Sequence, residues 1–399
     1  MTESDLSPFA HPGARGWTAP APIASARDFH RTIEGYRPTP LVEIPEVAAE
    51  FTTQLGVGRV FLKDESERLG LPAFKILGAS WAVARSLAAR LGVLIEGASL
   101  TSLRAAIGNS PLTLVTATDG NHGRAVSRLA RLLDIRARVY TPAGVSAAAL
   151  DGIRSEGVEL IEFDAGYDEV VRAAAASAEG HDDEVLIQDT SWPGYEAVPR
   201  WIVEGYTTLF SELDEQLAAL DLAPDAVVVP TGVGSLLQAA VEYYRGTSVL
   251  RPAIVSVEPV AAACVLESLM ADEIKTVDTS RGTIMTGLCT GTTSEIAWPS
   301  LRGGLDLALA VDDGEARTAV EDLGRWGLDV GPCGAASLAG IRRVLGSQKL
   351  VEELGLPKSP VLVLLSTEGL AANPLPDDAN LPDAASLHPG AGLTNGGES

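Results

Sequence analysis

The apolar positions of the chain follow two alternating periods. Short runs rich in β-branched residues predict strands at 57–64, 112–118, 136–142, 157–164, 184–189, 225–230, 253–259 and 361–367. The stretches between them repeat apolar residues at helical spacing and predict helices at 75–92, 146–156, 167–178, 196–220 and 235–244, with a further helix after the turn at 119–123. Strands that alternate with helices predict an α/β fold with mostly parallel sheets flanked by helices.

Both ends of the chain lack this periodicity. The first 28 residues are rich in Pro, Ala and Ser, and we expect them to form a coil on the surface. Residues 375–399 are rich in Pro, Asp, Ala and Gly, a composition that predicts a disordered tail. The part of the chain between these ends shows no internal repeat.

Composition and charge exclude some kinds of binding partner. The chain has 30 basic and 53 acidic residues, a formal net charge of −23, which argues against nucleic acid or an anionic membrane surface as a partner. No apolar stretch reaches the length of a membrane span, and the N-terminus lacks the basic start and apolar run of a secretory signal. Cys264, Cys289 and Cys333 lack metal-ligand spacing, so we expect no metal site and a reducing, cytoplasmic location.

Candidate chemistry lies where the predicted strands end, because ligands of open α/β sheets bind at the carboxyl ends of strands. Lys75 stands between Phe74 and Ile76 at the start of an apolar helix. A lysine that loses hydration there favours a nucleophilic amine able to form a Schiff base. The alternative is a lysine whose stem follows the helix end while its ammonium reaches water.

Two glycine-containing turns are candidate anion sites. The backbone amides of the turn at 118–123 could receive an anion, and Asn121 could donate to a ligand oxygen. The alternative is an ordinary helix start capped by Asp119, and His122 alone is more typical of a hydrogen-bonded structural histidine. The turn from Thr231 to Ser235 follows an apolar strand and could form a phosphate cradle, although tight turns also require glycine.

Two further strand ends carry polar side chains. Asp189 could act as a general base or could cap the next turn. Ser366 and Thr367 end a late strand, where a hydroxyl could meet a ring nitrogen or could simply mark the exit of the strand. Taken in order, these candidates match what pyridoxal phosphate requires: an amine for its aldehyde, a partner for its phenolic oxygen, a phosphate site and a group at its pyridine nitrogen.

Six segments carry a resemblance to a known family. They are FLKDESERLGLPAFKILGAS (61–80), TATDGNHGRAVS (116–127), QDTSWPGYEAVPRWIVEGYTTL (188–209), PTGVGS (230–235), TIMTGLCTG (283–291) and STEG (366–369). In these segments the chain resembles the tryptophan-synthase-β-type (fold type II) pyridoxal-phosphate enzymes, and within them the diaminopropionate ammonia-lyase family. Asp119 is the most specific point, because threonine-dehydratase-like relatives usually carry a different residue before GNHG.

The resemblance implies a role for each matching residue. Lys75 is implied to be the Schiff-base lysine, with Phe74 beside the cofactor ring, and Asn121 to meet the phenolic oxygen. Asp119 and Asp189 match the two aspartates that act as bases toward opposite enantiomers of the substrate. The implied phosphate site is Gly232, Val233, Gly234 and Ser235, and the pyridine nitrogen is implied to face Ser366 or Thr367.

The resemblance also implies an activity and an architecture. The activity is elimination from 2,3-diaminopropionate, a small amino acid, to give pyruvate and ammonia with pyridoxal phosphate as cofactor. A larger domain would comprise 1–84 and 196–374, a smaller βα domain would be inserted at 85–195, and the enzyme would be a homodimer.

Three segments depart from the family pattern. They are VAAAC (260–264), TGLCTGTTSEIAW (286–298) and DVGPCGAASLAG (329–340), and we expect them near the substrate or at the cofactor rim. These departures leave a nearer alternative, elimination from or replacement on another β-substituted amino acid such as serine or threonine, against which the two aspartates argue. A more distant alternative is a relative without catalysis that binds a ligand or partner, against which Lys75 argues.

Overall fold

Two β-sheets organise the chain in the computed structural model, which describes residues 6–20, 24, 26–56, 58–118 and 120–376. The larger sheet has the strand order β1 (Phe9–Ala10), β10 (Leu307–Val311), β9 (Ala253–Pro259), β8 (Ala226–Pro230), β11 (Val361–Ser366), β3 (Arg59–Asp64) and β2 (Leu41–Glu43). Its five central strands are parallel, whereas β1 and β2 run antiparallel at the two edges.

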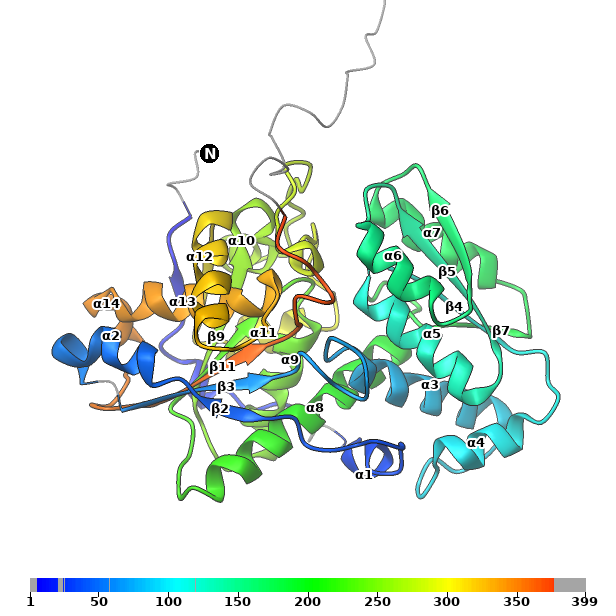
Figure 1. Ribbon diagram of the computed structural model, residues 1–399, viewed down its shortest axis with the longest axis horizontal. Helices are drawn as coiled ribbons and strands as arrows, with labels where there is room; N and C mark the ends of the chain where they lie inside the picture. Colours follow the sequence, from blue (N-terminus) through cyan, green and yellow to red (C-terminus); the bar gives the residue numbers. More distant parts are fainter. Residues whose placement is uncertain (1–5, 21–23, 25, 57, 119, 377–399) are drawn as a thin grey trace, which may run out of the picture.

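The smaller sheet is entirely parallel. Its strand order is β6 (Glu159–Phe163), β5 (Arg136–Pro142), β4 (Thr113–Ala117) and β7 (Glu184–Leu186). Figure 1 shows this sheet, with its helices, beside the larger one. The predicted α/β class with mostly parallel sheets is therefore confirmed.

Helices connect the strands and cover the sheets. They are α1 (Arg27–His30), α2 (Pro45–Leu55), α3 (Ile76–Leu91), α4 (Leu100–Ile107), α5 (Asn121–Leu133), α6 (Ala147–Arg154), α7 (Tyr167–Ala178), α8 (Ala197–Ala218), α9 (Ser235–Glu242), α10 (Cys264–Ala271), α11 (Trp298–Gly304), α12 (Asp313–Arg325), α13 (Pro332–Leu345) and α14 (Gln348–Glu353). In the described part of the chain, none of them is long and apolar enough to cross a membrane.

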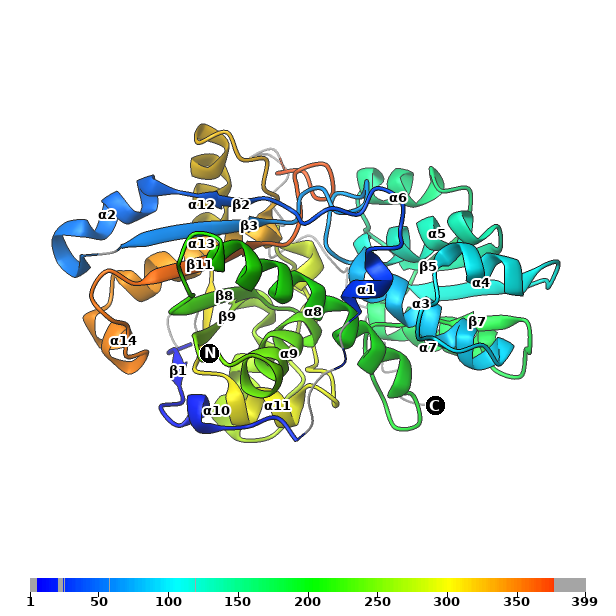
Figure 2. The same ribbon diagram turned by 90° about the horizontal axis from the view of Figure 1, so that it is seen from below.

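The central strands of the larger sheet are apolar throughout because both of their faces are covered. In β8, Val227 and Val229 pack into the core that contains residues of α3, α8 and α9, whereas Ala226 and Val228 pack into the core that contains residues of α12 and α13. Figure 2 shows α8 and α9 on one side of this sheet and α12 and α13 on the other. Alternate residues of each strand therefore pack into two different cores. The residues that follow the strands lie outside both cores and can be polar.

The helices α3 and α8 approach each other closely, and two glycines make this possible. A Cβ atom added to Gly78 would lie 2.5 Å from the Tyr206 ring, and one added to Gly205 would lie 2.5 Å from the Leu77 carbonyl oxygen. Such contacts are shorter than packed atoms allow, so a larger residue would push the helices apart. Since Lys75 is the N-cap residue of α3, this contact also fixes where its side chain starts.

A buried ion cluster holds the loop between β3 and α3. Lys63, Glu65, Arg68 and Glu212 are all almost fully buried. Arg68 binds both carboxylates, with distances of 2.6 Å to Glu65 and 2.8 Å to Glu212, and the Lys63 ammonium lies 3.0 Å from Glu212. The loop that leads to Lys75 is thereby attached to α8 by charged groups with no access to water.

The sequence pattern predicted most of the elements around the candidate site. Each of the strands and helices named above from sequence is present, with ends that shift by a few residues, and β7 stops at Leu186 rather than continuing to Asp189. The expectation of coil for the first 28 residues was wrong at Phe9–Ala10, which pair with the edge of β10, at Ala14–Gly16, which form a 3-10 turn, and at Arg27 and Asp28, which begin α1. A two-residue edge strand has too few positions to show a period.

Two predictions about organisation keep their status as predictions. The boundary proposed between residues 84 and 85 falls inside α3, and the division into a larger and an inserted smaller domain is not tested by these observations. The tail predicted at 375–399 lies outside the described residues except for 375 and 376.

Candidate active site

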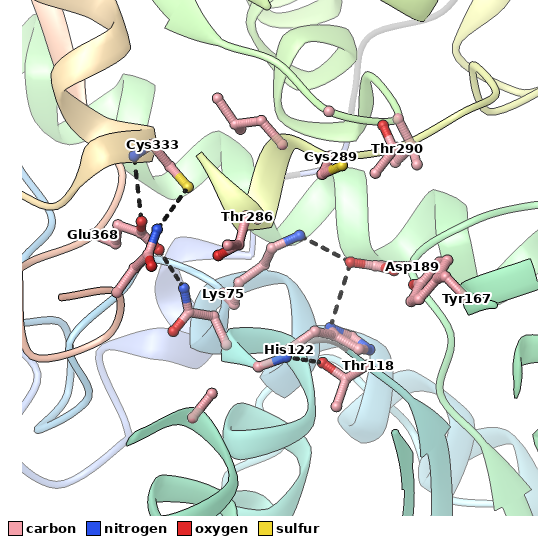
Figure 3. A pocket seen from close by; sticks show the side chains of 18 of the residues that line it. Lys75, Thr118, His122, Tyr167, Asp189, Thr286, Cys289, Thr290, Cys333 and Glu368 are labelled. Carbon is pink, nitrogen blue, oxygen red and sulfur yellow. Dashed lines mark hydrogen bonds and ion pairs between the residues drawn. The ribbon is translucent and has the colours of Figure 1, made fainter. Parts of the chain in front are cut away.

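A cavity of about 470 Å³ lies where the carboxyl ends of strands from both sheets meet. Residues that follow β4, β5, β8 and β11 line it, together with the start of α3 and the segment after β7. Figure 3 shows Lys75, His122, Asp189 and Glu368 around this space. The predicted site residues that line it are Phe74, Lys75, Asn121, Asp189, Gly232, Val233, Gly234, Ser235 and Thr367.

The Lys75 amine faces this cavity. Its Nζ atom lies 2.8 Å from Asp189 Oδ2 and 5.5 Å from the centroid of the Phe74 ring. The side chain is 23% exposed, so it is neither sealed in the core nor extended along the surface. An amine in this position can meet a carbonyl group bound in the cavity, with a carboxylate beside it to accept or return a proton.

Asp189 is ionised by its neighbours despite its burial. Burial raises the pKa of a carboxyl group, but the charges of Lys75 and His122 and the hydrogen bond from Lys75 outweigh it and lower the pKa of Asp189 to about 2. His122 Nε2 donates to the Ile187 carbonyl at 2.8 Å, and its Nδ1 lies 3.9 Å from Asp189 Oδ2. Burial lowers the pKa of His122, and the nearby Asp189 carboxylate opposes this effect.

The ion pair makes the stability of the cofactor-free protein depend on pH through Asp189. Since its pKa is lowered from 3.8 to about 2 by folding, the pair stabilises the fold fully above pH 3.8 and loses this effect as the pH falls through about 2. We expect Asp189→Asn to lower the urea midpoint at neutral pH and this difference to shrink below pH 3.8. Urea denaturation over a pH series measures it, and a difference independent of pH would contradict the assignment.

The turn between β8 and α9 has the form of an anion cradle. Gly234 adopts a left-handed φ of +98°, and a Cβ there would lie 2.9 Å from Leu301 Cδ1. A Cβ on Gly232 would lie 3.4 Å from the Gly287 carbonyl oxygen. The first N–H groups of α9 have no hydrogen-bond partner within the helix, and the residues that carry them line the cavity. This turn can therefore bind a phosphate group.

The structure separates the two candidate hydroxyls at the end of β11. Thr367 lines the cavity, and its buried Oγ1 has no hydrogen-bond partner among the described residues. The Ser366 hydroxyl instead lies 3.5 Å from the Glu368 carbonyl oxygen, and Ser366 is absent from the lining. Thr367 is therefore the hydroxyl available to a ring nitrogen, and an amine, an amide cradle and an unpartnered hydroxyl around one cavity fit pyridoxal phosphate.

Several residues of the lining were not predicted from the sequence, and Glu368 is the acidic one among them. Glu368 is 2% exposed, and its Oε2 accepts a 2.7 Å hydrogen bond from Asn121 Nδ2. The sequence did offer a signal, because an acidic residue directly follows Ser366 and Thr367. The interpretation of this strand end considered only the two hydroxyl groups. Asp119, in contrast, lies outside the described residues.

The segments that depart from the family pattern differ in their position. Thr286, Cys289 and Thr290 of the segment 286–298 line the cavity, as does Cys333 of the segment 329–340. The lining includes no residue of 260–264, but Cys264 Sγ lies 3.8 Å from the Gly232 carbonyl oxygen, so this segment lies directly behind the turn at 231–235. Within the described ranges, no group of three or more His, Cys, Asp or Glu side chains is placed to hold a metal ion.

Comparison with known proteins agrees with these features. A sequence model of the family "Pyridoxal-phosphate dependent enzyme" matches residues 33–367. A diaminopropionate ammonia-lyase of Escherichia coli K12 is 37% identical over 355 residues, which cover 86% of this chain and 87% of that protein. An L-threonine dehydratase of Mycobacterium leprae is 32% identical over 231 residues, which cover 57% of this chain and 52% of that protein.

A comparison with solved structures finds the same kind of relative. The crystal structure of diaminopropionate ammonia lyase from Escherichia coli in complex with D-serine matches this chain with a TM-score of 0.82 and 34% sequence identity. The match covers 92% of this chain and 94% of that one. The similarity therefore extends over both sheets and over the cavity between them.

Proposed function

This chain belongs to the pyridoxal-phosphate-dependent enzyme family, and we propose that it is an ammonia-lyase that converts 2,3-diaminopropionate to pyruvate and ammonia. The observation that carries the proposal is the Lys75 amine 2.8 Å from the Asp189 carboxylate, inside a cavity that also holds an anion cradle. The similarity to diaminopropionate ammonia-lyases over most of the chain supports the choice of substrate.

The residues around the cavity would divide the work of holding the cofactor. The turn from Gly232 to Ser235 would hold its phosphate, Asn121 its phenolic oxygen and Thr367 its ring nitrogen, with Phe74 beside the ring and Lys75 at its aldehyde. Bound there, pyridoxal phosphate would supply a conjugated ring that accepts the electrons released when the substrate loses its α-proton.

Asp189 would serve the substrate in two ways. A carboxylate attracts the second ammonium group of 2,3-diaminopropionate, and it can remove the α-proton. Its pKa of about 2 depends on the Lys75 charge beside it. When the Lys75 nitrogen no longer carries a full ammonium charge, the pKa of Asp189 rises, which makes the carboxylate a stronger base.

The two aspartates should separate the two enantiomers of the substrate. If Asp119 and Asp189 act as bases from different sides of the substrate, Asp119→Asn and Asp189→Asn should each lower kcat for one enantiomer by roughly 10²-fold or more and affect the other much less. Steady-state kinetics with L- and D-2,3-diaminopropionate measure this selectivity. Equal losses for both enantiomers in both variants would show that the residues do not act as separate bases.

A spectroscopic titration tests the proposal as a whole. We expect the purified protein, supplied with pyridoxal phosphate, to show a visible absorption band that changes on addition of L- or D-2,3-diaminopropionate, together with release of pyruvate. A band that responds only to serine or threonine would favour a dehydratase. Absence of any band in the presence of excess cofactor would contradict cofactor binding at Lys75.

The dehydratase alternative rests on specific residues of the cavity. Cys289, Thr290 and Cys333 belong to the segments that depart from the family pattern, and all three line the space that a substrate would share with the cofactor. The partial similarity to a threonine dehydratase points the same way. Its shorter coverage makes it the second choice.

The proposal also covers the oligomeric state of the protein and its location in the cell. We propose a homodimer in the cytoplasm that binds no nucleic acid and no membrane. The formal net charge of −23 supports the exclusion of polyanionic partners, and three cysteines without metal-ligand spacing suit a reducing compartment. The dimer follows from the family resemblance, and sedimentation of the purified protein measures it.

A further inference from the structure

Glu368 is a buried carboxyl group in the cavity whose hydrogen-bond partners are neutral. Its Oε2 accepts a 2.7 Å hydrogen bond from Asn121 Nδ2, and its Oε1 accepts a 3.3 Å bond from the Cys333 backbone N–H (Figure 3). Across the described ranges, no Lys, Arg or His side chain forms an ion pair with it. Burial raises the pKa of Glu368, and hydrogen bonds from Cys333, Asn373 and Asn121 oppose the rise.

The elements of the larger sheet hold this carboxyl group in place. The Gly331 N–H donates to the Glu368 carbonyl oxygen at 3.0 Å. A Cβ on Gly331 would lie 3.1 Å from Glu368 Cγ, and one on Gly334 would lie 3.2 Å from the Glu368 carbonyl oxygen. The start of α13 therefore packs directly against Glu368, which leaves its side chain little freedom to turn.

Asn121 comes from the other side of the cavity. It is the first residue of α5, which packs against the smaller sheet, whereas Glu368 follows β11 of the larger sheet. The bond between them joins residues 247 positions apart. A fixed group from one side thus contacts a group that the proposed function assigns to the cofactor.

The direction of the Asn121 amide has a chemical consequence. An amide group has one donor end and one acceptor end, and a rotation by half a turn exchanges them. The phenolic oxygen of the cofactor, when ionised, accepts hydrogen bonds, so only the N–H end of the amide stabilises it. Because Glu368 accepts from Nδ2, this end is held on the side of the carboxyl group, and the second N–H of Nδ2 is available to the cavity.

We propose that Glu368 is a positioning residue that fixes the amide of Asn121 with its N–H end toward the phenolic oxygen of the bound cofactor. The inference rests on the proposed function, because it takes pyridoxal phosphate as the occupant of the cavity. It goes beyond that function by assigning to Glu368 an effect on the cofactor that acts through Asn121.

Replacement of Glu368 by glutamine tests the proposal with little change in shape. Because the Cys333 N–H needs the oxygen of the new amide as its acceptor, the N–H end of that amide faces Asn121 and favours the reversed orientation. We expect the visible band of the bound cofactor to shift and the Kd of pyridoxal phosphate for the cofactor-free protein to rise about tenfold, the effect of one lost hydrogen bond. Absorbance titration of the cofactor-free protein measures both quantities.

A double substitution shows whether the effect passes through Asn121. In an Asn121→Ala background, Glu368→Gln should cause no further shift of the band and no further rise of Kd. A shift of equal size in both backgrounds would overturn the proposal, because Glu368 would then act independently of Asn121. An unchanged band and Kd in the single variant Glu368→Gln would overturn it as well.

Glu258 provides a matched control. It is also fully buried and accepts two backbone N–H groups, those of Val265 and Leu266 at 2.8 Å, but it does not line the cavity. Glu258→Gln should therefore leave the band and the Kd unchanged. If Glu368→Gln does not fold, Glu368→Asp withdraws the carboxyl group from Asn121 by one methylene, and the same shift is expected; an unshifted band there overturns the proposal.

The outcome also separates this inference from the proposed function. If the unsubstituted protein shows no band with excess cofactor, the proposed function fails, and the inference fails with it. If the unsubstituted protein shows the band and turns over 2,3-diaminopropionate while Glu368→Gln behaves identically, the inference alone fails.

Discussion

Lys75→Ala should lose the visible band of bound pyridoxal phosphate and lower kcat/KM for 2,3-diaminopropionate by roughly 10³-fold or more. Among the described residues, the Lys75 amine is the only lysine nitrogen in the lining of the cavity, where it lies 2.8 Å from Asp189. Without it, no amine within the described lining can bond to the aldehyde of the cofactor. Absorption spectra and pyruvate release, measured on the same preparation, test both parts of this prediction.

One further variant at Lys75 tests whether the amine or only its charge is needed, and an exposed lysine serves as the control. Lys75→Arg keeps a cation beside Asp189 but offers no amine that can form a carbon–nitrogen double bond, so we expect activity to be lost while the fold is retained. Lys349→Ala removes an ammonium that is 81% exposed and should change neither property. Retention of more than about a tenth of the activity in Lys75→Arg would contradict the assigned role.

The helices that the sequence pattern left unassigned differ in burial, because α4 and α12 keep an exposed face whereas α13 does not. Nearly all residues of α13 are buried, so its apolar positions show no helical period that would distinguish a packed face from a wet one. The helix α5 behaves differently, because Arg124, Arg128 and Arg131 mark a polar face opposite Val126 and Leu129. A visible period does not by itself decide which helices the sequence shows, because all residues of α9 are buried and this helix was predicted, whereas α4 keeps an exposed face and was not.

The location of the site could be predicted because it follows from the fold class. Parallel strands bring their carboxyl ends to one edge, so polar residues that follow β4, β8 and β11 were expected to meet there. The choice between Ser366 and Thr367 could not be made in this way, because it depends on which side chain turns toward the cavity. The contact between Glu368 and Asn121 likewise depends on how the two sheets are placed relative to each other.

Loss of the Glu212 carboxylate should destabilise the fold more than any single change on the surface. Glu212 accepts hydrogen bonds from Arg68, Lys63 and Tyr36 at 2.7 to 3.0 Å, and it is fully buried. Although burial raises the pKa of a carboxyl group, these partners lower that of Glu212 to about 2. Glu212→Gln leaves two buried cations with Glu65 as the remaining carboxylate of the cluster, and we expect the free energy of unfolding to fall by about 3–5 kcal/mol.

A surface ion pair supplies the comparison that makes this prediction specific. Glu43 and Arg59 form a two-contact pair at the edge of the larger sheet, but both side chains are more than a third exposed. Glu43→Gln should therefore change the free energy of unfolding by less than about 1 kcal/mol. Urea denaturation of both variants measures the contrast, and similar small losses in the two would show that the buried cluster is not what holds the loop before Lys75. Because that loop sets the position of the amine, Glu212→Gln should also weaken cofactor binding, whereas Glu43→Gln should leave it unchanged.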